Sequence, residues 1–272
     1  MEDLARLCVH TITTKPWSLD IAIDQFARAG VPGIAVWRDV IENRSIGSVR
    51  KQIGDAGLQV VSLVRGGFFA SADSAARKNA VKDNLGAIAD AAELGAPMVV
   101  LVCGADPAQS LAESRKQILD GISRIAPTAA DAGVQLAIEP LHPMYSDTKS
   151  AIPTLKSAND ACAELGLENV GVALDVYHLW WDPDLEAEIR RCGELGALFA
   201  FHVCDWRVPT RDFLLDRTVM GEGCIDVAAI RHMVDAAGYS GFIEVEIFSS
   251  EYWATDQTAF LDRIITAYRE KV

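Results

Sequence analysis

The sequence predicts a single (β/α)8 barrel over residues 1–272, and three observations support this prediction. Eight short apolar runs alternate with longer amphipathic stretches from one end of the chain to the other. Glycine follows many of the amphipathic stretches, where a left-handed residue would end a helix. Strand–helix alternation produces a parallel sheet, and eight such units in 272 residues match a closed barrel.

The predicted strands are the short apolar runs. In chain order they cover residues 7–11, 33–37, 59–64, 98–103, 135–139, 171–175, 198–202 and 242–247. Runs of this length are typical of strands that are buried on both faces, as in a parallel sheet. An open doubly wound sheet is the alternative layout, but it usually carries G-x-G-x-x-G after its first strand. Residues 10–14 (HTITT) contain no glycine, so the barrel is favoured.

The predicted helices are the amphipathic stretches that separate the strands. They include residues 18–29, 46–56, 74–94 and 109–132. Glycines stand just beyond helix ends at positions 30, 57, 95, 133, 196 and 238. No Pro-rich or Ser-rich linker interrupts the alternation, so we expect one domain.

The composition indicates a globular chain with an acidic surface. The chain has 25 Lys and Arg against 38 Asp and Glu, a formal net charge of −13, and 50% hydrophobic residues. This apolar content excludes disordered and fibrous classes. The charge argues against nucleic acid and membrane partners, since polyanions and anionic lipid would be repelled. We expect a small-molecule partner instead.

Compartment is predicted from the N-terminus and the cysteines. Residues 1–14 lack the basic start and apolar stretch of a signal peptide, and no apolar run approaches the roughly 20 residues of a membrane span. The six cysteines are scattered without a C-x-x-C pair, which disfavours a disulfide framework or a zinc knuckle. These observations favour a reducing cytoplasm.

Polar residues on the last four predicted strands follow the alternation of a sheet. Apolar residues on one parity, such as Phe199 and Phe201, are expected to face the helices. The other parity points into the barrel; in the last strand it includes Glu244. At the C-terminal end of each strand this parity delivers one ionisable side chain: Glu139, Asp175, His202 and Glu246.

These four residues predict a metal site. Barrel enzymes carry their active sites at the C-terminal ends of the strands. Three carboxylates that converge there would repel one another unless a cation neutralised them. Oxygen donors with one imidazole favour Mn²⁺, with Co²⁺, Mg²⁺ or Zn²⁺ as alternatives, and no nucleotide or flavin is expected. Cys204 shares the parity of His202 but is interpreted as a pocket wall.

Five motifs extend the argument beyond strand parity. They are residues 136–143 (LAIEPLHP), 175–178 (DVYH), 201–207 (FHVCDWR), 221–226 (GEGCID) and 243–248 (IEVEIF). With these motifs the chain resembles the xylose-isomerase-like TIM barrels, in particular the bacterial sugar phosphate isomerase/epimerase group that includes ketose 3-epimerases and inosose dehydratases. The resemblance covers essentially the whole chain. Members of the group commonly pair, so a homodimer or homotetramer is expected.

The resemblance also implies roles for individual residues. It implies a metal bound by the same four residues, with Glu139 and Glu246 as the acid–base pair. It places His178 and Arg207 at positions where relatives contact substrate oxygens. Residues 221–226 depart from a phosphate site, because two carboxylates, Glu222 and Asp226, lie at the start of the following helix. We therefore expect an unphosphorylated keto-sugar or its acid.

The expected reaction is isomerisation or epimerisation of that keto-sugar. With a carbonyl and its neighbouring hydroxyl bound to the metal, a carboxylate could remove the adjacent proton to give a metal-stabilised enediolate. The alternative is a lyase on a 3-keto sugar or sugar acid, meaning a dehydratase, deglycosidase or decarboxylase that uses the same site. A DNA-repair endonuclease of this fold is disfavoured, because it would need a His-rich zinc cluster and a basic groove, whereas the chain has 5 His and charge −13. A non-catalytic sugar-binding barrel, or a subunit of a larger assembly, would not require both Glu139 and Glu246.

Further residues at predicted strand ends are candidates for substrate contact. His10 is interpreted as a hydrogen-bonded wall residue, and Trp37 as part of the pocket. Arg65 would bind a substrate carboxylate or hydroxyl, or else pair with Asp39. His142 would orient Glu139, touch substrate, or pack within its Pro-bounded turn.

Overall fold

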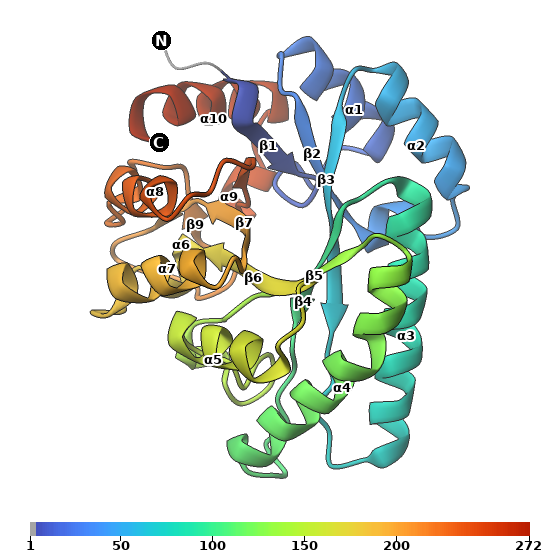
Figure 1. Ribbon diagram of the computed structural model, residues 1–272. Helices are drawn as coiled ribbons and strands as arrows, with labels where there is room; N and C mark the ends of the chain where they lie inside the picture. The colour runs from blue at the N-terminus through green and yellow to red at the C-terminus, as the bar shows by residue number, and fades with distance from the viewer. Residues whose placement is uncertain (1–3) are drawn as a thin grey trace.

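The computed structural model describes residues 4–272 and contains a closed barrel of eight parallel strands (Figure 1). In chain order the barrel strands are β1 (Leu7–His10), β2 (Gly33–Trp37), β3 (Gln59–Gly67), β4 (Met98–Val102), β5 (Gln135–Ile138), β6 (Val170–Asp175), β7 (Leu198–Val203) and β10 (Ile243–Val245). Each strand pairs with the next, and β10 pairs with β1 to close the ring. The predicted (β/α)8 barrel is confirmed, with strand ends shifted by one or a few residues.

Helices surround the barrel (Figure 1). They are α1 (Leu19–Arg28), α2 (Ile46–Asp55), α3 (Ser74–Leu94), α4 (Leu111–Asp131), α5 (Leu155–Leu165), α7 (Leu185–Glu194), α8 (Val227–Ala236) and α10 (Gln257–Lys271). Short helices α6 (Val176–Leu179) and α9 (Ser250–Trp253), and an antiparallel pair β8 (Asp205–Trp206) and β9 (Arg217–Thr218), lie in the connections. Side chains at the N-caps, such as Ser18 and Thr154, accept backbone N–H groups and fix where helices begin.

Within residues 4–272 no helix is both long enough and apolar enough to cross a bilayer. The expectation that the chain lacks a signal peptide concerns residues 1–14, of which residues 1–3 lie outside the described residues.

Two separate cores confirm the alternation predicted for the strands. Leu136, Ile138 and Leu174 belong to the large cluster between the strands and the helices. Ala137 and Ala173 belong to a smaller cluster inside the barrel. Small side chains at these inner positions leave room across the barrel. The next inward-facing residues, two positions further along each strand, are polar, and they meet at the mouth of the barrel.

Phe199 departs from the predicted pattern. Val172 pairs with Leu198 but Ala173 pairs with Ala200, so Phe199 is an extra residue in β7. The predicted outward position of Phe199 is therefore wrong: it packs against the inner cluster, whereas Phe201 faces the helices. Because a bulge restores the alternation after one residue, His202 still points inward.

The Phe199 ring fills the space beside Gly171, and this contact yields a prediction. A Cβ at position 171 would lie 2.5 Å from both the Phe199 ring and the Ala197 carbonyl oxygen. We expect Gly171→Ala to lower the free energy of unfolding by about 1–3 kcal/mol, as overpacking does. Gly86→Ala is the control: position 86 lies in α3 with open space around it, and its unfolding free energy should rise by about 0.5–1 kcal/mol. Urea denaturation measures both free energies of unfolding. Equal changes in the two variants would contradict the close packing of Phe199 against Gly171.

Candidate functional site

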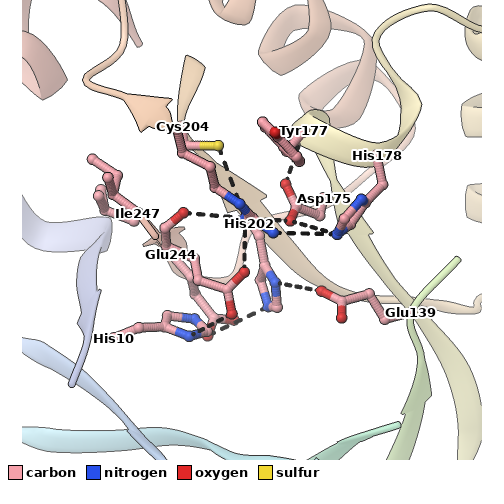
Figure 2. A network of polar contacts seen from close by, with 12 residues as sticks. His10, Glu139, Asp175, Tyr177, His178, His202, Cys204, Glu244 and Ile247 are labelled. Atoms are coloured by element: carbon pink, nitrogen blue, oxygen red, sulfur yellow. Dashed lines mark hydrogen bonds and ion pairs between the residues drawn. The ribbon is translucent and has the colours of Figure 1, made fainter. Parts of the chain in front are cut away.

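Four strand ends bring the predicted donor residues together. Glu139 directly follows β5, Asp175 ends β6, and His202 lies in β7. Glu246 directly follows β10. All four side chains are buried, and one ligand atom from each lies within 4.8 Å of the others. Figure 2 shows Glu139, Asp175 and His202 approaching one point from different strands.

The donor set suits a divalent cation. Ligand atoms about 2.0–2.4 Å from one ion lie about 3–4.8 Å from each other, which this grouping allows. Three carboxylates and one imidazole are ligands of divalent first-row metals and Mg²⁺. His10, His202 and Glu246 form a second, overlapping group of possible ligands.

Arg217, which the sequence argument did not select, enters the same centre from β9. Its Nη1 lies 2.9 Å from both Asp175 Oδ2 and Glu246 Oε2. Its Nη2 donates to His178 Nε2 at 3.2 Å, and its guanidinium lies 4.3 Å from the centre of the Tyr177 ring. Arg217 stands on a connection outside the barrel, so strand periodicity could not identify it. It is a buried cation among the predicted ligands.

Glu244 lies in β10, two residues before Glu246, and joins the same network of polar contacts (Figure 2). Its Oε2 accepts hydrogen bonds from His10 Nε2 at 3.1 Å and Ser62 Oγ at 3.0 Å, and it lies 3.8 Å from His202 Nε2. The alternation placed Glu244 inside the barrel but assigned it no role. The structure shows it bound to His10, which faces Glu246, and close to His202, which faces Glu139.

Crowded carboxylates shift the pKa values of the centre. Burial lowers the pKa of His202, but Glu244, Glu139 and Glu246 outweigh it and raise the value to about 10. Burial raises the pKa of Asp175 to about 6, although Arg217 acts in the opposite direction. Burial and Arg217 lower the pKa of His178. The surrounding carboxylates thus favour a positive charge at His202, and a bound divalent cation would supply that charge instead.

A cavity of about 230 Å³ adjoins this centre. Glu139, Glu246 and Arg217 line it, together with three residues predicted to contact substrate: His178, Arg65 and Trp37. Arg65 stacks against the rings of Trp37 and Phe68, with its guanidinium carbon 5.8 and 4.9 Å from their centres. The alternative ion pair with Asp39 is not formed.

Three other predicted contact residues do not line the cavity. Arg207 pairs with Asp216 at 2.9 Å and approaches Glu251 at 3.5 Å. His142 accepts the backbone N–H of Met144 and lies 5.5 Å from the rings of Trp181 and Trp206. His10 is fully buried below the cavity, against Glu244.

These placements have a common reason. The β8–β9 pair turns Arg207 toward Asp216 of its own connection and returns Arg217 to the centre. The number of residues between His202 and each arginine cannot reveal whether Arg207 or Arg217 lies among the predicted ligands. Cys204 was predicted to be a pocket wall, but it is buried 4.0 Å from Arg217 Nη1 and does not line the cavity.

The glycine loop at residues 221–225 is closed by Asp205. The Asp205 carboxylate accepts N–H groups from Gly221, Gly223 and Ile225 at 2.8–2.9 Å, and from Trp206 at 2.8 Å. The N–H groups that could bind a phosphate are therefore already paired within the chain.

Asp205→Ala should lower the free energy of unfolding by about 3 kcal/mol, because it removes the acceptor of four backbone N–H groups, of which that of Ile225 is buried. Asp212→Ala is the matched control: it removes the acceptor of two N–H groups in an exposed loop, and we expect a loss below about 1 kcal/mol. Urea denaturation of both variants measures the difference; equal losses would show that the Asp205 contacts are not special.

Comparison with known proteins places this geometry in context. Residues 23–264 match the sequence profile of the family described as xylose isomerase-like TIM barrel. The L-ribulose 3-epimerase of Mesorhizobium japonicum is 28% identical over 264 residues, which are 91% of this chain and 83% of that protein. The inosose isomerase of Halalkalibacterium halodurans is 25% identical over 190 residues, 68% of this chain but only 65% of that protein's length.

Solved structures agree on the fold. Protein SMc04130 from Sinorhizobium meliloti 1021 is 40% identical, with a TM-score of 0.96 over 99% of both chains. The IolI protein with a bound zinc atom is 20% identical, with a TM-score of 0.86 over 98% of both chains. At that identity the second comparison supports the fold alone.

Proposed function

Because the chain belongs to the xylose isomerase-like TIM barrel family, we propose that it is a divalent-metal-dependent isomerase or epimerase of a small, unphosphorylated keto-sugar. The observation that carries the proposal is the convergence of Glu139, Asp175, His202 and Glu246 within 4.8 Å beside a cavity. Two relatives, an inosose isomerase and an L-ribulose 3-epimerase, have names of the same reaction type.

The four donors are proposed to hold one divalent ion. Mn²⁺ is the preferred ion, with Co²⁺, Mg²⁺ and Zn²⁺ as alternatives; the IolI structure contains zinc. A divalent ion bound there would polarise a substrate carbonyl and make the adjacent C–H more acidic.

The residues of the chain supply the proton transfers and the positioning. Glu139 and Glu246 both line the cavity, and we assign them as the acid–base pair. Return of the proton to the opposite face of the same carbon gives epimerisation, and return to the neighbouring carbon gives isomerisation. Uncharged His178 and the cation of Arg217 would bind substrate oxygens, and Trp37 would present an apolar face to the sugar.

Size supports a small substrate. The cavity volume of about 230 Å³ is below the range typical of drug-sized ligands, and it fits a single sugar unit. From the family resemblance we also propose that residues 1–272 act as one domain, as a homodimer or homotetramer, in the cytoplasm.

The proposal predicts metal-dependent exchange of a substrate hydrogen. Protein stripped with chelator and then reloaded with Mn²⁺ is incubated with a panel of ketoses in D₂O. Deuterium should enter the carbon next to the carbonyl, without loss of any group, at a rate at least about a hundredfold above that of the stripped protein.

Other outcomes of the same assay are decisive. Release of water, an aglycone or CO₂ would favour the lyase alternative. Full exchange by the stripped protein would refute metal dependence, provided that elemental analysis shows it to be metal-free.

A further inference from the structure

Two cations beside the cavity, Arg65 and Lys149, have no carboxylate partner in residues 4–272. Both line the cavity. The Arg65 guanidinium stacks on Trp37 and Phe68, which leaves its N–H edges available. Lys149 is half-buried, and its Nζ lies 4.4 Å from the centre of the Tyr145 ring. Neither cation takes part in an ion pair of the described structure.

What distinguishes these two cations is their place in the cavity lining. The chain has 38 acidic side chains against 25 basic ones, and other cations are paired, as Arg38 is with Asp83. Asp212 interacts electrostatically with Lys149, but its Oδ1 accepts the N–H groups of Leu214 and Leu215. The carboxylates in the cavity lining, Glu139 and Glu246, belong to the donor group.

Arg65, Lys149 and Arg217 all line this one cavity. Burial lowers the pKa of Lys149, and the charges of Arg65 and Arg217 lower it further. A neutral sugar would leave this repulsion in place, whereas a bound anion would relieve it and gain charge-assisted hydrogen bonds.

We infer that the substrate is a keto-sugar acid whose terminal carboxylate is bound by Arg65 and Lys149. The inference rests on the proposed function, since it assumes that this cavity binds the sugar. Carboxylate is favoured over phosphate because the cavity is only about 230 Å³. In addition, the glycine loop, whose N–H groups could otherwise bind a phosphate, does not line the cavity, and its Gly221 and Gly223 N–H groups are already bound by Asp205.

The test compares ketoses that differ only at C6. D-fructose, D-fructuronate and D-fructose 6-phosphate share one carbon chain and carbonyl, as do D-tagatose and D-tagaturonate. Isothermal titration calorimetry gives the Kd of each for the Mn²⁺-loaded protein. In at least one series the keto acid should bind ten or more times tighter than its neutral ketose, and this preference should shrink as salt is added.

Variants of Lys149 and Arg65 test whether these two residues cause the preference for the keto acid. Lys149→Gln and Arg65→Gln should each reduce it about tenfold, whereas Lys149→Arg should retain most of it. Lys15→Gln is the matched control, because Lys15 also lies over an aromatic ring, 4.8 Å from the centre of Trp253, but outside the cavity lining. It should leave the preference unchanged, and thermal unfolding shows that each variant is folded.

Contrary results are distinguishable from failure of the proposed function. Three results would each overturn the inference. They are equal Kd values for keto acid and ketose, no binding of either keto acid, and an unchanged preference in both Gln variants. Tighter binding of D-fructose 6-phosphate than of D-fructuronate would overturn the choice of carboxylate. Deuterium exchange into neutral ketoses would still support the function, whereas a charge preference without exchange would support the ligand class alone.

Discussion

Replacing Glu139 with glutamine is expected to slow metal-dependent deuterium exchange into the substrate by about a thousandfold. Glutamine cannot accept the substrate proton as a carboxylate does, and a well-placed acid or base contributes about 10²–10⁴ to a rate. The amide also binds a divalent cation less strongly, so Mn²⁺ affinity should fall. Folding should change little, because the amide oxygen can still accept the hydrogen bond that Glu139 Oε1 shares with His202 Nδ1 at 3.2 Å.

Single-turnover exchange at saturating Mn²⁺ separates the lost proton transfer from the weaker metal affinity. Glu164→Gln is the matched control, since Glu164 is exposed on α5, and it should keep the parent rate. A Glu139→Gln protein that exchanges within tenfold of the parent would rule out Glu139 as an acid or base. Glu246→Gln is a less clean probe, because Glu246 also binds the buried Arg217.

Replacing Arg217 with leucine should lower the free energy of unfolding in chelator by about 3–5 kcal/mol. The variant removes the cation that contacts Asp175 and Glu246 and leaves two buried carboxylates without it. Added Mn²⁺ should restore most of the loss, since those carboxylates are two of the four proposed ligands. Free metal at about a thousand times its Kd stabilises a folded protein by about 4 kcal/mol.

Thermal and urea unfolding with chelator and with Mn²⁺ measure this effect. Arg38→Leu serves as the control, because its pair with Asp83 lies near the surface; it should cost about 1 kcal/mol or less and respond to Mn²⁺ as the parent does. An Arg217→Leu protein with the same stability in both solutions would show that the four donors do not share an ion.

The donor residues could be predicted from sequence because a parallel strand has a fixed side-chain period and direction. Leu136 and Ile138 mark the outer face of β5, so Glu139 must point inward at its C-terminal end. The same reasoning failed at Phe199, since a one-residue bulge reverses the faces locally and leaves no clear mark in an apolar run.

Other residues of the centre depend on how the connections fold. Arg217 and Arg207 lie on one connection, and either could have turned toward the carboxylates. The pairing of β8 with β9 and the ion pair between Arg207 and Asp216 select Arg217. Likewise, the partners of Asp205 are backbone N–H groups up to 20 residues away, which no residue-type pattern identifies.

Amino-acid order alone was enough to predict the barrel and the four side chains at its mouth. Both follow from local periodicity, which each strand carries within its own few residues. Three-dimensional packing was needed to choose the arginine that lies among the carboxylates and to place Glu244 beside His10. It also decided that Arg65 and Lys149 line the cavity with no acidic partner among residues 4–272. Those features are contacts between segments far apart in the chain, and their free energies depend on which groups remain unpaired once the barrel has closed.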